Sequence, residues 1–600
     1  MSTRDGLEFG SAGKGAAFDM PQDHIHQKEP ENRTTPERLL ETVTLKSGPQ
    51  GLASPLIFAP ASVNLFVGPN HSGKSLFLRE VRAAFQNPEQ AVHRKVLQDI
   101  TFVPFDDKRR SVLADEIRQA SQLSRDRPDA NVVLMKGYWS QEFGRDHFKQ
   151  LLDGASKMRD VGDHEHFRKF FLAGSFLTLG GAERLNMLQP TKREPPHPSY
   201  YVNLLSRLFY SDEKRQTVQT IIKEAFGYYF VVDPLGENFE AKISAVAPSS
   251  SIERSLSSEA VEFFGTTISI NEMSDGVRAF CGSIAAVVVE DAKVILIDEP
   301  EAFLHPALCV KLAKELCKRA QKNGQQLFIA THSASFLMGC VQAGVDLNIV
   351  RLTYRDGAAT SRVLPQKQIV PLMRQPLLRS IGALTGIFYE SVIVTEADSD
   401  RAFYDEINHR CLNAGDERAI PDVLFLNAQN WQTTARIIAP LRDLGVAAAA
   451  IVDIDLLLEG KSDAFQTLME SAGMPPSSRT ALGQLRGDLH RLVKPLAEKL
   501  KSEGASCLSG TNRRDLQNFI DQLATVGVFV VPVGELESWL PTLTREPSSG
   551  KNEWLVRTFE AMGENANDDS YVQPTSGDVW DFIGHIRKWL HDPARMGMPE

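Results

Sequence analysis

The segment that most constrains this chain is residues 68–75, which fit the pattern G-x-x-x-x-G-K-[S/T]. An apolar run at residues 62–67 precedes the segment, and an amphipathic pattern at residues 74–85 follows it. The chain therefore passes from a strand through a glycine-rich turn into a helix. Glycines at this place let backbone N–H groups close around phosphate oxygens, and the helix N-terminus adds its dipole. A plain glycine turn is the alternative, and the flanking strand and helix disfavour it.

Positions within this loop have distinct expected roles in binding a nucleotide. Lys74 should contact the β- and γ-phosphates, and the hydroxyl of Ser75 should bind Mg²⁺. The residues that we assign to nucleotide binding are Gly68, Pro69, Asn70, His71, Ser72, Gly73, Lys74 and Ser75. The loop thus predicts ATP and Mg²⁺ as ligands.

Two later strands end in residues suited to hydrolysis. The apolar run at 294–297 leads into Asp298 and Glu299, and the run at 328–330 is followed closely by His332. Asp298 would hold the Mg²⁺ shell, and Glu299 would polarise the attacking water as general base. His332 would sense the γ-phosphate. A structural histidine is the alternative, but the order of His332 after the acidic pair favours the functional role.

Strand and helix patterns alternate around these motifs and again from about residue 389, which is typical of an α/β fold with largely parallel sheets. The first residues are rich in charged residues, glycine and proline and poor in aliphatic ones, so we expect them to be flexible. The expected organisation is a tail at 1–40, an ATPase domain at 41–385, and a second domain at 386–600 with a helical insertion at about 457–525.

Carboxylates follow three strands of the second domain. The acids are Glu396 and Asp400 after the strand at 391–395, Asp453 and Asp455 after that at 448–452, and Glu535 and Glu537 after that at 526–533. Because the carboxyl ends of parallel strands share one edge of a sheet, we expect these acids to converge. Their hard oxygen atoms suit Mg²⁺ or Mn²⁺. Solvent-exposed acids at helix and strand ends are the alternative for any single one, but the ordered set favours a metal site.

Residues 273–278 have the sequence Met-Ser-Asp-Gly-Val-Arg and lie a short way before the acidic pair. With the motifs above, they resemble an ABC-type ATPase of the SMC and DNA-repair branch, which has an LSGGQ signature at this place. Ser274 and Gly276 match the serine and the second glycine of that signature, whereas Asp275 and Val277 depart from it. The resemblance implies that Ser274 and Gly276 complete the ATP site of a second protomer, in a homodimer or higher homo-oligomer. A helix N-cap at Ser274 is the alternative, and both can hold.

Residues 396–404 resemble the E-G-x-S-D-x-x-F-Y sequence of Toprim domains, with Ala397 in place of glycine. The later Asp-Ile-Asp sequence resembles the Asp-x-Asp of that family. The resemblance implies a Rossmann-like domain with Glu396 as metal ligand or general base, Asp400 and Asp453 as ligands, Asp455 as a second ligand, and either Glu537 or Glu535 as the late acid. Glu396 and Asp453 would be its catalytic residues.

An ABC-type ATPase followed by a Toprim domain is the layout of the OLD (overcoming lysogenization defect) family of ATP-dependent nucleases and of related bacterial anti-phage proteins. The resemblance covers about residues 55–600. It implies a nucleotide-controlled, Mg²⁺-dependent endonuclease that cuts DNA or RNA, with Mn²⁺ as an alternative ion and a partner protein encoded alongside. An ATP-driven sensor or scaffold, whose Toprim part is structural or acts only when a partner triggers it, is the alternative. A transporter subunit would leave the acid-ended strands unexplained.

Composition limits the partners and the compartment. A formal net charge of -10 gives no general attraction to nucleic acid, so such binding needs a local basic surface or metal ions. The expected insertion would either supply that surface or form solvated helices, and its basic residues include Arg479, Arg486, Arg491, Lys494, Lys499, Lys501, Arg513 and Arg514. No apolar run is long enough to cross a bilayer and no secretory signal is recognisable, so we expect a cytoplasmic protein without membrane contact. The cysteines form no C-x-x-C pair, which argues against a zinc site.

Overall fold

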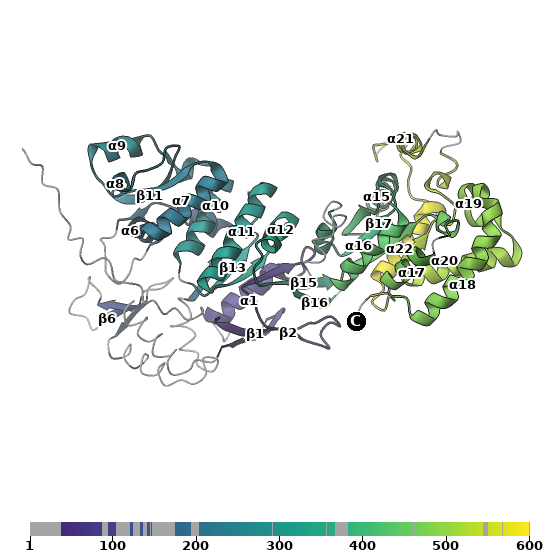
Figure 1. The fold of residues 1–600 in the computed structure, drawn as a ribbon, viewed down its shortest axis with the longest axis horizontal. Coiled ribbons are helices and arrows are strands. Elements are labelled where there is room, and N and C mark those ends of the chain that lie inside the picture. The colour runs from purple at the N-terminus through teal and green to yellow at the C-terminus, as the bar shows by residue number, and fades with distance from the viewer. Residues whose placement is uncertain are drawn as a thin grey trace, which may run out of the picture. The chain divides into compact units, whose positions relative to one another are not determined.

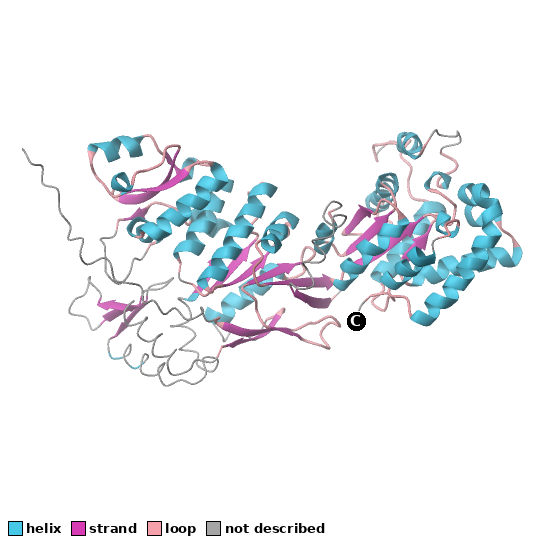
Figure 2. Cartoon of the chain, viewed as in Figure 1, coloured by secondary structure: helices cyan, strands magenta, loops and turns pink. Residues whose placement is uncertain are grey.

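The protein is described by a computed structural model. The residues that it describes are 38–86, 94–103, 175–193, 203–290, 292–355, 357–365, 382–460, 462–543, 550–566 and 568–598, together with the backbone of the short strands β5 (Ser121–Leu123), β6 (Val132–Met135) and β7 (Gln141–Gly144). Helices and strands alternate along most of these ranges (Figure 2). The expected α/β class with parallel sheets is confirmed.

A six-stranded sheet carries the residues of the predicted nucleotide site (Figure 1). Its strands are β3 (Val63–Val67), β8 (Phe176–Leu179), β13 (Val294–Asp298), β14 (Gln326–Ala330), β15 (Leu347–Arg355) and β16 (Ala358–Pro365). Their order is β16-β15-β3-β14-β13-β8, and neighbours are parallel except for β15 and β16. Since β14 lies between β3 and β13, three strands that precede predicted site residues end side by side.

Side chains of a strand point alternately to the two faces of the sheet. Both faces of this sheet carry apolar side chains, and helices cover both. Phe66 and Phe328 pack on the face covered by α1 (Lys74–Gln86), where the rings of Phe66 and Phe77 stack with centroids 4.1 Å apart. Leu65 and Ile329 belong instead to the hydrophobic cluster on the other face. The helices contributing to that cluster include α10 (Asp275–Val289), α11 (Pro306–Asn323) and α12 (Ala334–Gln342).

Smaller elements complete the first half of the chain. They are β1 (Leu40–Leu45), β2 (Leu56–Phe58), β4 (Leu97–Phe102), α5 (Gly181–Asn186), β9 (Thr191–Lys192), α6 (Leu204–Tyr210), α7 (Asp212–Phe226), β10 (Tyr229–Asp233), β11 (Asn238–Ser244), α8 (Ser250–Glu253), α9 (Ser258–Gly265), β12 (Ile268–Ser269) and the 3₁₀ helix η5 (Ile270–Glu272). The strands β10, β11 and β12 are antiparallel neighbours.

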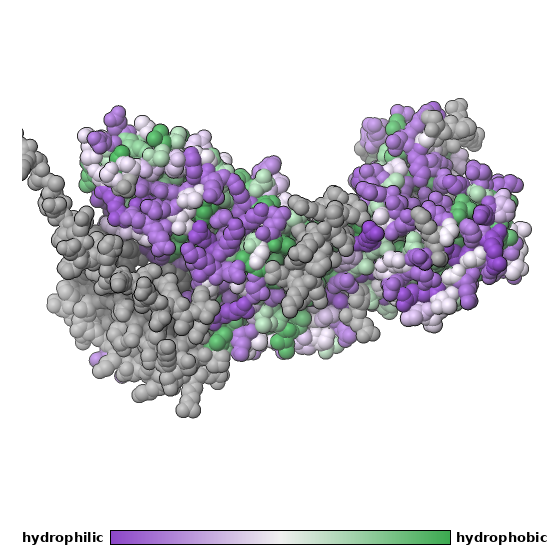
Figure 3. Space-filling view, viewed as in Figure 1, coloured by the Kyte–Doolittle hydropathy of each residue, from purple (hydrophilic) through white to green (hydrophobic). Residues whose placement is uncertain are grey.

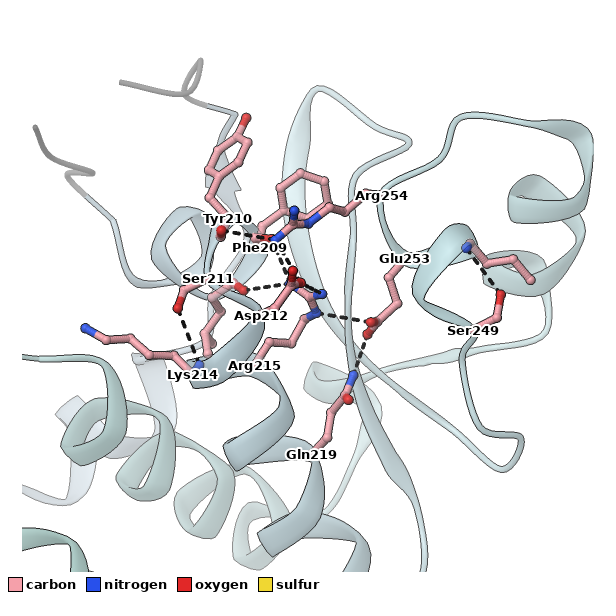
Figure 4. A network of polar contacts seen from close by, with 12 residues as sticks. Phe209, Tyr210, Ser211, Asp212, Lys214, Arg215, Gln219, Ser249, Glu253 and Arg254 are labelled. Atoms are coloured by element: carbon pink, nitrogen blue, oxygen red, sulfur yellow. Dashed lines mark hydrogen bonds and ion pairs between the residues drawn. The ribbon is translucent and has the colours of Figure 1, made fainter. Parts of the chain in front are cut away.

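A polar network joins α8 to α7 (Figure 4). Arg215 of α7 is 2% exposed, and its Nη1 donates to the carbonyl oxygen of Phe209 at 2.8 Å. Its Nε lies 3.2 Å from a carboxylate oxygen of the buried Glu253, and its Nη2 pairs with Asp212. The network thus fixes the α8 segment on α7 by a buried ion pair.

A second sheet of four parallel strands forms the later part of the chain, in the order β18-β17-β19-β20. Its strands are β17 (Ser391–Thr395), β18 (Val423–Asn427), β19 (Ala447–Val452) and β20 (Val528–Val530). The helices around it are η6 (Ala383–Phe388), α15 (Asp398–Asn413), α16 (Trp431–Asp443), η7 (Ile454–Leu457), α17 (Ser462–Ser471), α18 (Pro476–Val493), η8 (Lys494–Leu496), α19 (Ala497–Glu503), η9 (Gly504–Cys507), α20 (Gly510–Thr525), η10 (Leu536–Ser538), α21 (Lys551–Met562) and α22 (Asp578–His591).

The faces of this sheet again divide by alternation. Ile393 and Ala449 pack with Phe403 of α15 and Ile586 of α22, whereas Val394 belongs to the cluster on the other face. Helices α17 to α20 lie between β19 and β20 in the chain. In the described part of the chain, no helix has both the length and the apolar character needed to span a membrane.

Candidate functional site

The turn after β3 needs glycine at two positions. Gly68 has φ +135° and Gly73 has φ +97°, a region that other residues seldom occupy. A Cβ on Gly68 would lie 2.0 Å from the carbonyl oxygen of Leu352 on the adjacent strand β15. His71 takes a left-handed conformation without being glycine, at φ +62°, and is exposed beside Asn70. The two motif glycines are therefore required by backbone geometry and by close approach.

Lys74 turns back over the loop that precedes it. Its side chain is buried, and Nζ donates to the carbonyl oxygens of Gly68 and Pro69, at 2.9 and 2.7 Å, and to Ser72 Oγ at 3.2 Å. Burial lowers the pKa of Lys74 to about 8, although the charge of Glu299 opposes the shift. The Lys74 ammonium group thus lies among oxygen acceptors at the N-terminus of α1. At this place it can also bind the oxygen atoms of a phosphate group.

Ser75 of α1 and Asp298 at the end of β13 are in direct contact, as we expect of two residues that bind one Mg²⁺. Ser75 Oγ donates to Asp298 Oδ1 at 2.9 Å. Burial raises the pKa of Asp298, while the hydrogen bond from Ser75 lowers it. A hydroxyl and a carboxylate oxygen this close are hard donors that fit Mg²⁺ in a nucleotide site.

Glu299, the predicted general base, has an unusual backbone. Its φ is +46°, although it is not glycine, and its N–H donates to the carbonyl oxygen of Ala330 at 2.9 Å. Arg184 of α5 donates from Nη1 to the carbonyl oxygen of Asp298 and from Nη2 to that of Glu299, both at 2.8 Å. Sequence reasoning missed Arg184, because arginine is mostly exposed in proteins.

His332 follows β14 and is held through its backbone. Its N–H donates to Glu301 Oε1 at 2.6 Å. Burial lowers the pKa of His332, and the nearby charge of Lys74 lowers it further. Burial also raises the pKa of Glu301, and Glu301 Oε2 has no hydrogen-bond partner. Sequence reasoning missed Glu301, which positions the histidine segment.

The predicted signature stands at the start of α10. Ser274 is the N-cap residue and is exposed, but its side chain makes no capping hydrogen bond. A Cβ on Gly276 would lie 2.6 Å from the carbonyl oxygen of Phe303, so the helix start passes close to the loop after β13. The capping alternative for the Ser274 hydroxyl is therefore not realised here.

The predicted carboxylates gather at one edge of the second sheet. Because β17 and β19 are parallel neighbours, Glu396 and Asp453 follow adjacent strand ends, and Asp453 N–H donates to Glu396 Oε1 at 2.7 Å. Burial raises the pKa of Glu396, and the charges of Asp453, Asp455 and Asp400 raise it further. Burial and the charge of Asp453 raise the pKa of Asp455 to about 6. These side chains influence one another electrostatically, as the strand-end argument predicts.

Asp400 both caps a helix and belongs to the acidic cluster, which are the two roles considered from the sequence. It lies in the first turn of α15, and its Oδ2 accepts a hydrogen bond from the Ala397 N–H at 3.1 Å. It is also 3% exposed, and burial raises its pKa to about 6, a shift that the charge of Lys551 opposes and that of Asp453 increases. Asp400 is therefore a helix cap that faces the other acids.

Lys551 is a functional candidate that sequence reasoning missed. It is the first residue of α21, and its Nζ lies 3.1 Å from Asp453 Oδ2 and 3.8 Å from Asp400 Oδ1. Burial lowers the pKa of Lys551, but the charges of Asp453 and Asp400 outweigh this effect and raise it. About 150 residues separate Lys551 from Asp400, so no local pattern indicates the contact.

The two late acids have different surroundings. Glu535 Oε1 pairs with Lys501 Nζ at 3.1 Å, whereas Glu537 Oε2 is buried without a hydrogen-bond partner. Asp455 Oδ1 is likewise buried and unpartnered. Orphaned carboxylate oxygens beside other acids fit a hard divalent cation. Among the residues that the structure describes, no three His, Cys, Asp or Glu side chains are already arranged as a metal site.

The helical insertion is not uniformly a basic surface. Arg486 is buried, and its Nη2 donates to the carbonyl oxygen of Leu456 at 2.8 Å and to that of Glu459. The expectation that Arg486 adds to a surface is wrong, because these carbonyls at the end of η7 bind it internally. Arg491 pairs with Asp488 within α18. Hydrophilic residues predominate on the side of this region shown in Figure 3.

Comparison with known proteins agrees with the geometry after β3, β13 and β14. Residues 63–338 match the family described as "AAA domain, putative AbiEii toxin, Type IV TA system". Residues 63–338 are a P-loop ATPase domain. The prediction of an ATPase that binds ATP is thereby confirmed, whereas residues after 338 lie outside the match.

Solved structures similar to the chain include heads of SMC proteins. The SmcHead bound to the C-winged helix domain of ScpA is 13% identical, with 55% of this chain and 99% of that chain covered and a TM-score of 0.30. The SMC head domain from Thermotoga maritima is 13% identical, with 54% and 98% covered and a TM-score of 0.28. No curated protein matches the chain.

Proposed function

We propose that the ATPase domain controls a metal-dependent nuclease formed by the second domain, in the arrangement of an ABC-type ATPase fused to a Toprim domain. The observation that carries this proposal is the gathering of Glu396, Asp400, Asp453 and Asp455 at the carboxyl edge of a parallel sheet. Placing four acids beside one another, with Asp400 and Asp453 buried, is unfavourable unless a cation compensates, so their convergence favours metal chemistry.

The acids of the second domain would bind a divalent metal ion and accept a proton from the attacking water. Asp400, Asp453 and Asp455, with Glu396 and Glu537, would hold Mg²⁺ or Mn²⁺, which when bound would supply an activated water and stabilise the leaving oxygen. Glu396 would accept a proton from that water, since burial raises its pKa.

Lys551 adds a cation to this edge. Its ammonium group neutralises part of the acidic cluster and is placed to bind a phosphate oxygen of the substrate. The substrate class is then a phosphodiester of DNA or RNA.

The ATPase domain would act as a pair of protomers. Lys74 would bind the phosphates, Ser75 with Asp298 would hold Mg²⁺, and Glu299 would orient the attacking water. Ser274 is exposed at the N-terminus of α10, where it would contact the nucleotide of a second protomer in a homodimer or higher homo-oligomer. Closing and opening of that pair would transmit the nucleotide state to the second domain.

The ion pairs of Lys551 also favour a second candidate function, an ATP-driven sensor whose acidic site acts only when a partner triggers it. In that case Lys551 stays paired with Asp453 and Asp400 until a partner protein displaces it. Under either candidate, the layout shared with OLD-type and anti-phage ATPase–Toprim proteins supports a cytoplasmic role in defence against phage.

A cleavage assay with the purified full chain tests the proposal. Plasmid DNA and total tRNA are incubated with Mg²⁺, Mn²⁺ or EDTA, with and without ATP, for the wild type and Glu396→Ala. We expect divalent-ion-dependent cleavage by the wild type alone. Cleavage that persists in EDTA, or equal cleavage by the variant, would refute the metal-dependent nuclease. No cleavage by either protein would instead favour the sensor.

A further inference from the structure

The contacts of Arg184 go beyond the motifs of the ATP site. We infer that Arg184 is a positioning residue for ATP hydrolysis, which fixes the backbone of Asp298 and Glu299 so that the Glu299 carboxylate can orient the attacking water. The inference rests on the proposed role of Glu299 as general base. It assigns a role to α5, which no recognised motif covers.

Both terminal nitrogens of the Arg184 guanidinium bind the end of β13. The residue is 1% exposed, and its two terminal nitrogens donate to two successive carbonyl oxygens, those of Asp298 and Glu299, both at 2.8 Å. Two parallel bonds from a planar group define the orientation of the peptide between those residues. Arg184 therefore acts on the main chain of the acidic pair and makes no hydrogen bond to either carboxylate.

The backbone at Glu299 needs such support. Its φ of +46° lies in the left-handed region, which residues with a side chain enter only when their surroundings hold them there. The Glu299 N–H bond to Ala330 fixes one end of the residue, and the Arg184 bond to its carbonyl oxygen fixes the other. The Ala302 N–H also donates to this carbonyl oxygen at 3.0 Å, so loss of Arg184 loosens the residue and lets its carboxylate shift.

Helix α5, which contains Arg184, also contacts α10, the helix that Ser274 caps. A Cβ on Gly282 of α10 would lie 2.2 Å from the Arg184 carbonyl oxygen, so α5 and α10 approach as closely as glycine permits. Arg278 of α10 donates from Nη2 to the carbonyl oxygen of Leu185 at 3.3 Å. Arg184 thus stands between the signature helix and the predicted general base of the same chain.

The test separates orientation of Glu299 from general destabilisation. We compare Arg184→Ala and Arg184→Lys with Arg215→Ala, a matched control that also removes a buried arginine bonded to backbone carbonyls, in the network of Figure 4 away from the acidic pair. Steady-state ATP hydrolysis gives kcat and KM, and a fluorescent ATP analogue gives Kd. Arg184→Ala should lower kcat roughly 100-fold, as misplacement of a catalytic group by about 1 Å does, with Kd unchanged.

Arg184→Lys should recover only part of that loss, because an ammonium group cannot hold two carbonyls in one plane. Arg215→Ala should melt at a lower temperature but keep its kcat. Adding Arg184→Ala to Glu299→Gln should cost little more than Glu299→Gln alone, since both changes remove one function.

Three results would overturn the inference: equal kcat losses in the Arg184→Ala and Arg215→Ala proteins, a change in Kd without one in kcat, or additive losses in the double variant. If Glu299→Gln itself hydrolyses ATP normally, the assigned base is wrong instead.

Discussion

Asp400 offers a direct test of the acidic site in the absence of metal. Its pKa rises from 3.8 to about 6, chiefly through burial. At about 1.4 kcal/mol per pKa unit, this difference corresponds to roughly 3 kcal/mol. Because the folded protein binds the proton more tightly than the unfolded chain, the folded state is favoured below pH 4 and loses stability as the pH rises towards 6. About half of the loss, roughly 1.5 kcal/mol, falls between pH 5 and pH 8.

Asp400→Asn removes this titration. The free energy of unfolding of the variant, relative to wild type, should therefore be roughly 1.5 kcal/mol larger (more stable) at pH 8 than at pH 5. For a unit of 150–250 residues this is roughly 3–6 °C in Tm. The side chain also caps α15 through the Ala397 N–H, so the variant loses some stability at both pH values, and only the change between them reports the titration.

Thermal melting in EDTA at pH 5 and pH 8 measures that change. Asp398→Asn is the matched control, because Asp398 lies in the same helical turn with its side chain 75% exposed. At pH 8, added Mg²⁺ should raise the Tm of the wild type and of Asp398→Asn, but much less that of Asp400→Asn, since only a competent site gains from ligand binding. A variant-to-wild-type difference that is the same at both pH values, or equal Mg²⁺ responses, would refute the reasoning.

Three further predictions concern the two sites. Lys74→Ala should weaken ATP binding at least about tenfold, whereas Glu299→Gln should retain binding and lose hydrolysis; near-normal turnover by the latter would remove its assigned role. Ser274→Arg should abolish ATP-dependent dimerisation in light scattering and, with it, hydrolysis, and intact activity would contradict the composite site. Glu396→Ala and Asp453→Ala should each lose metal-dependent cleavage at least about 100-fold with unchanged ATPase rates and little change in Tm, and cleavage at the wild-type rate would count against both assignments.

The ATP site was predictable because its chemistry is local in sequence. The strand, the glycine turn and the helix around Lys74 are contiguous, and the apolar strand before Asp298 ends directly at the acid. The order of parallel strands then places these ends together, as the bond between Ser75 and Asp298 shows. Continuous apolar runs were equally sufficient for the two sheets, because the strands of a parallel sheet are buried on both faces.

The partners of the site residues were not predictable in the same way. Lys551 meets Asp453 although about 100 residues separate them, and Glu301 reaches the His332 N–H from another strand end. Nothing in the local pattern distinguishes these residues from surface ones. Arg486 shows the reverse error, since its basic character indicated a surface while the fold buries it.

Two buried arginines hold the backbone next to acidic strand ends without pairing with the acids themselves. Arg184 binds the carbonyl oxygens of Asp298 and Glu299, and Arg486 binds that of Leu456, the residue after Asp455. An arginine paired with the carboxylates themselves would lower their pKa values and occupy the oxygens that a metal or a water must reach. Bonding to the backbone instead satisfies a carbonyl near the end of a strand or helix, and Arg184 also brings a positive charge close to Asp298 and Glu299. The charge of Arg184 opposes the rise in the pKa of Asp298 and so limits the repulsion between the acids after β13, while their oxygens remain available for chemistry.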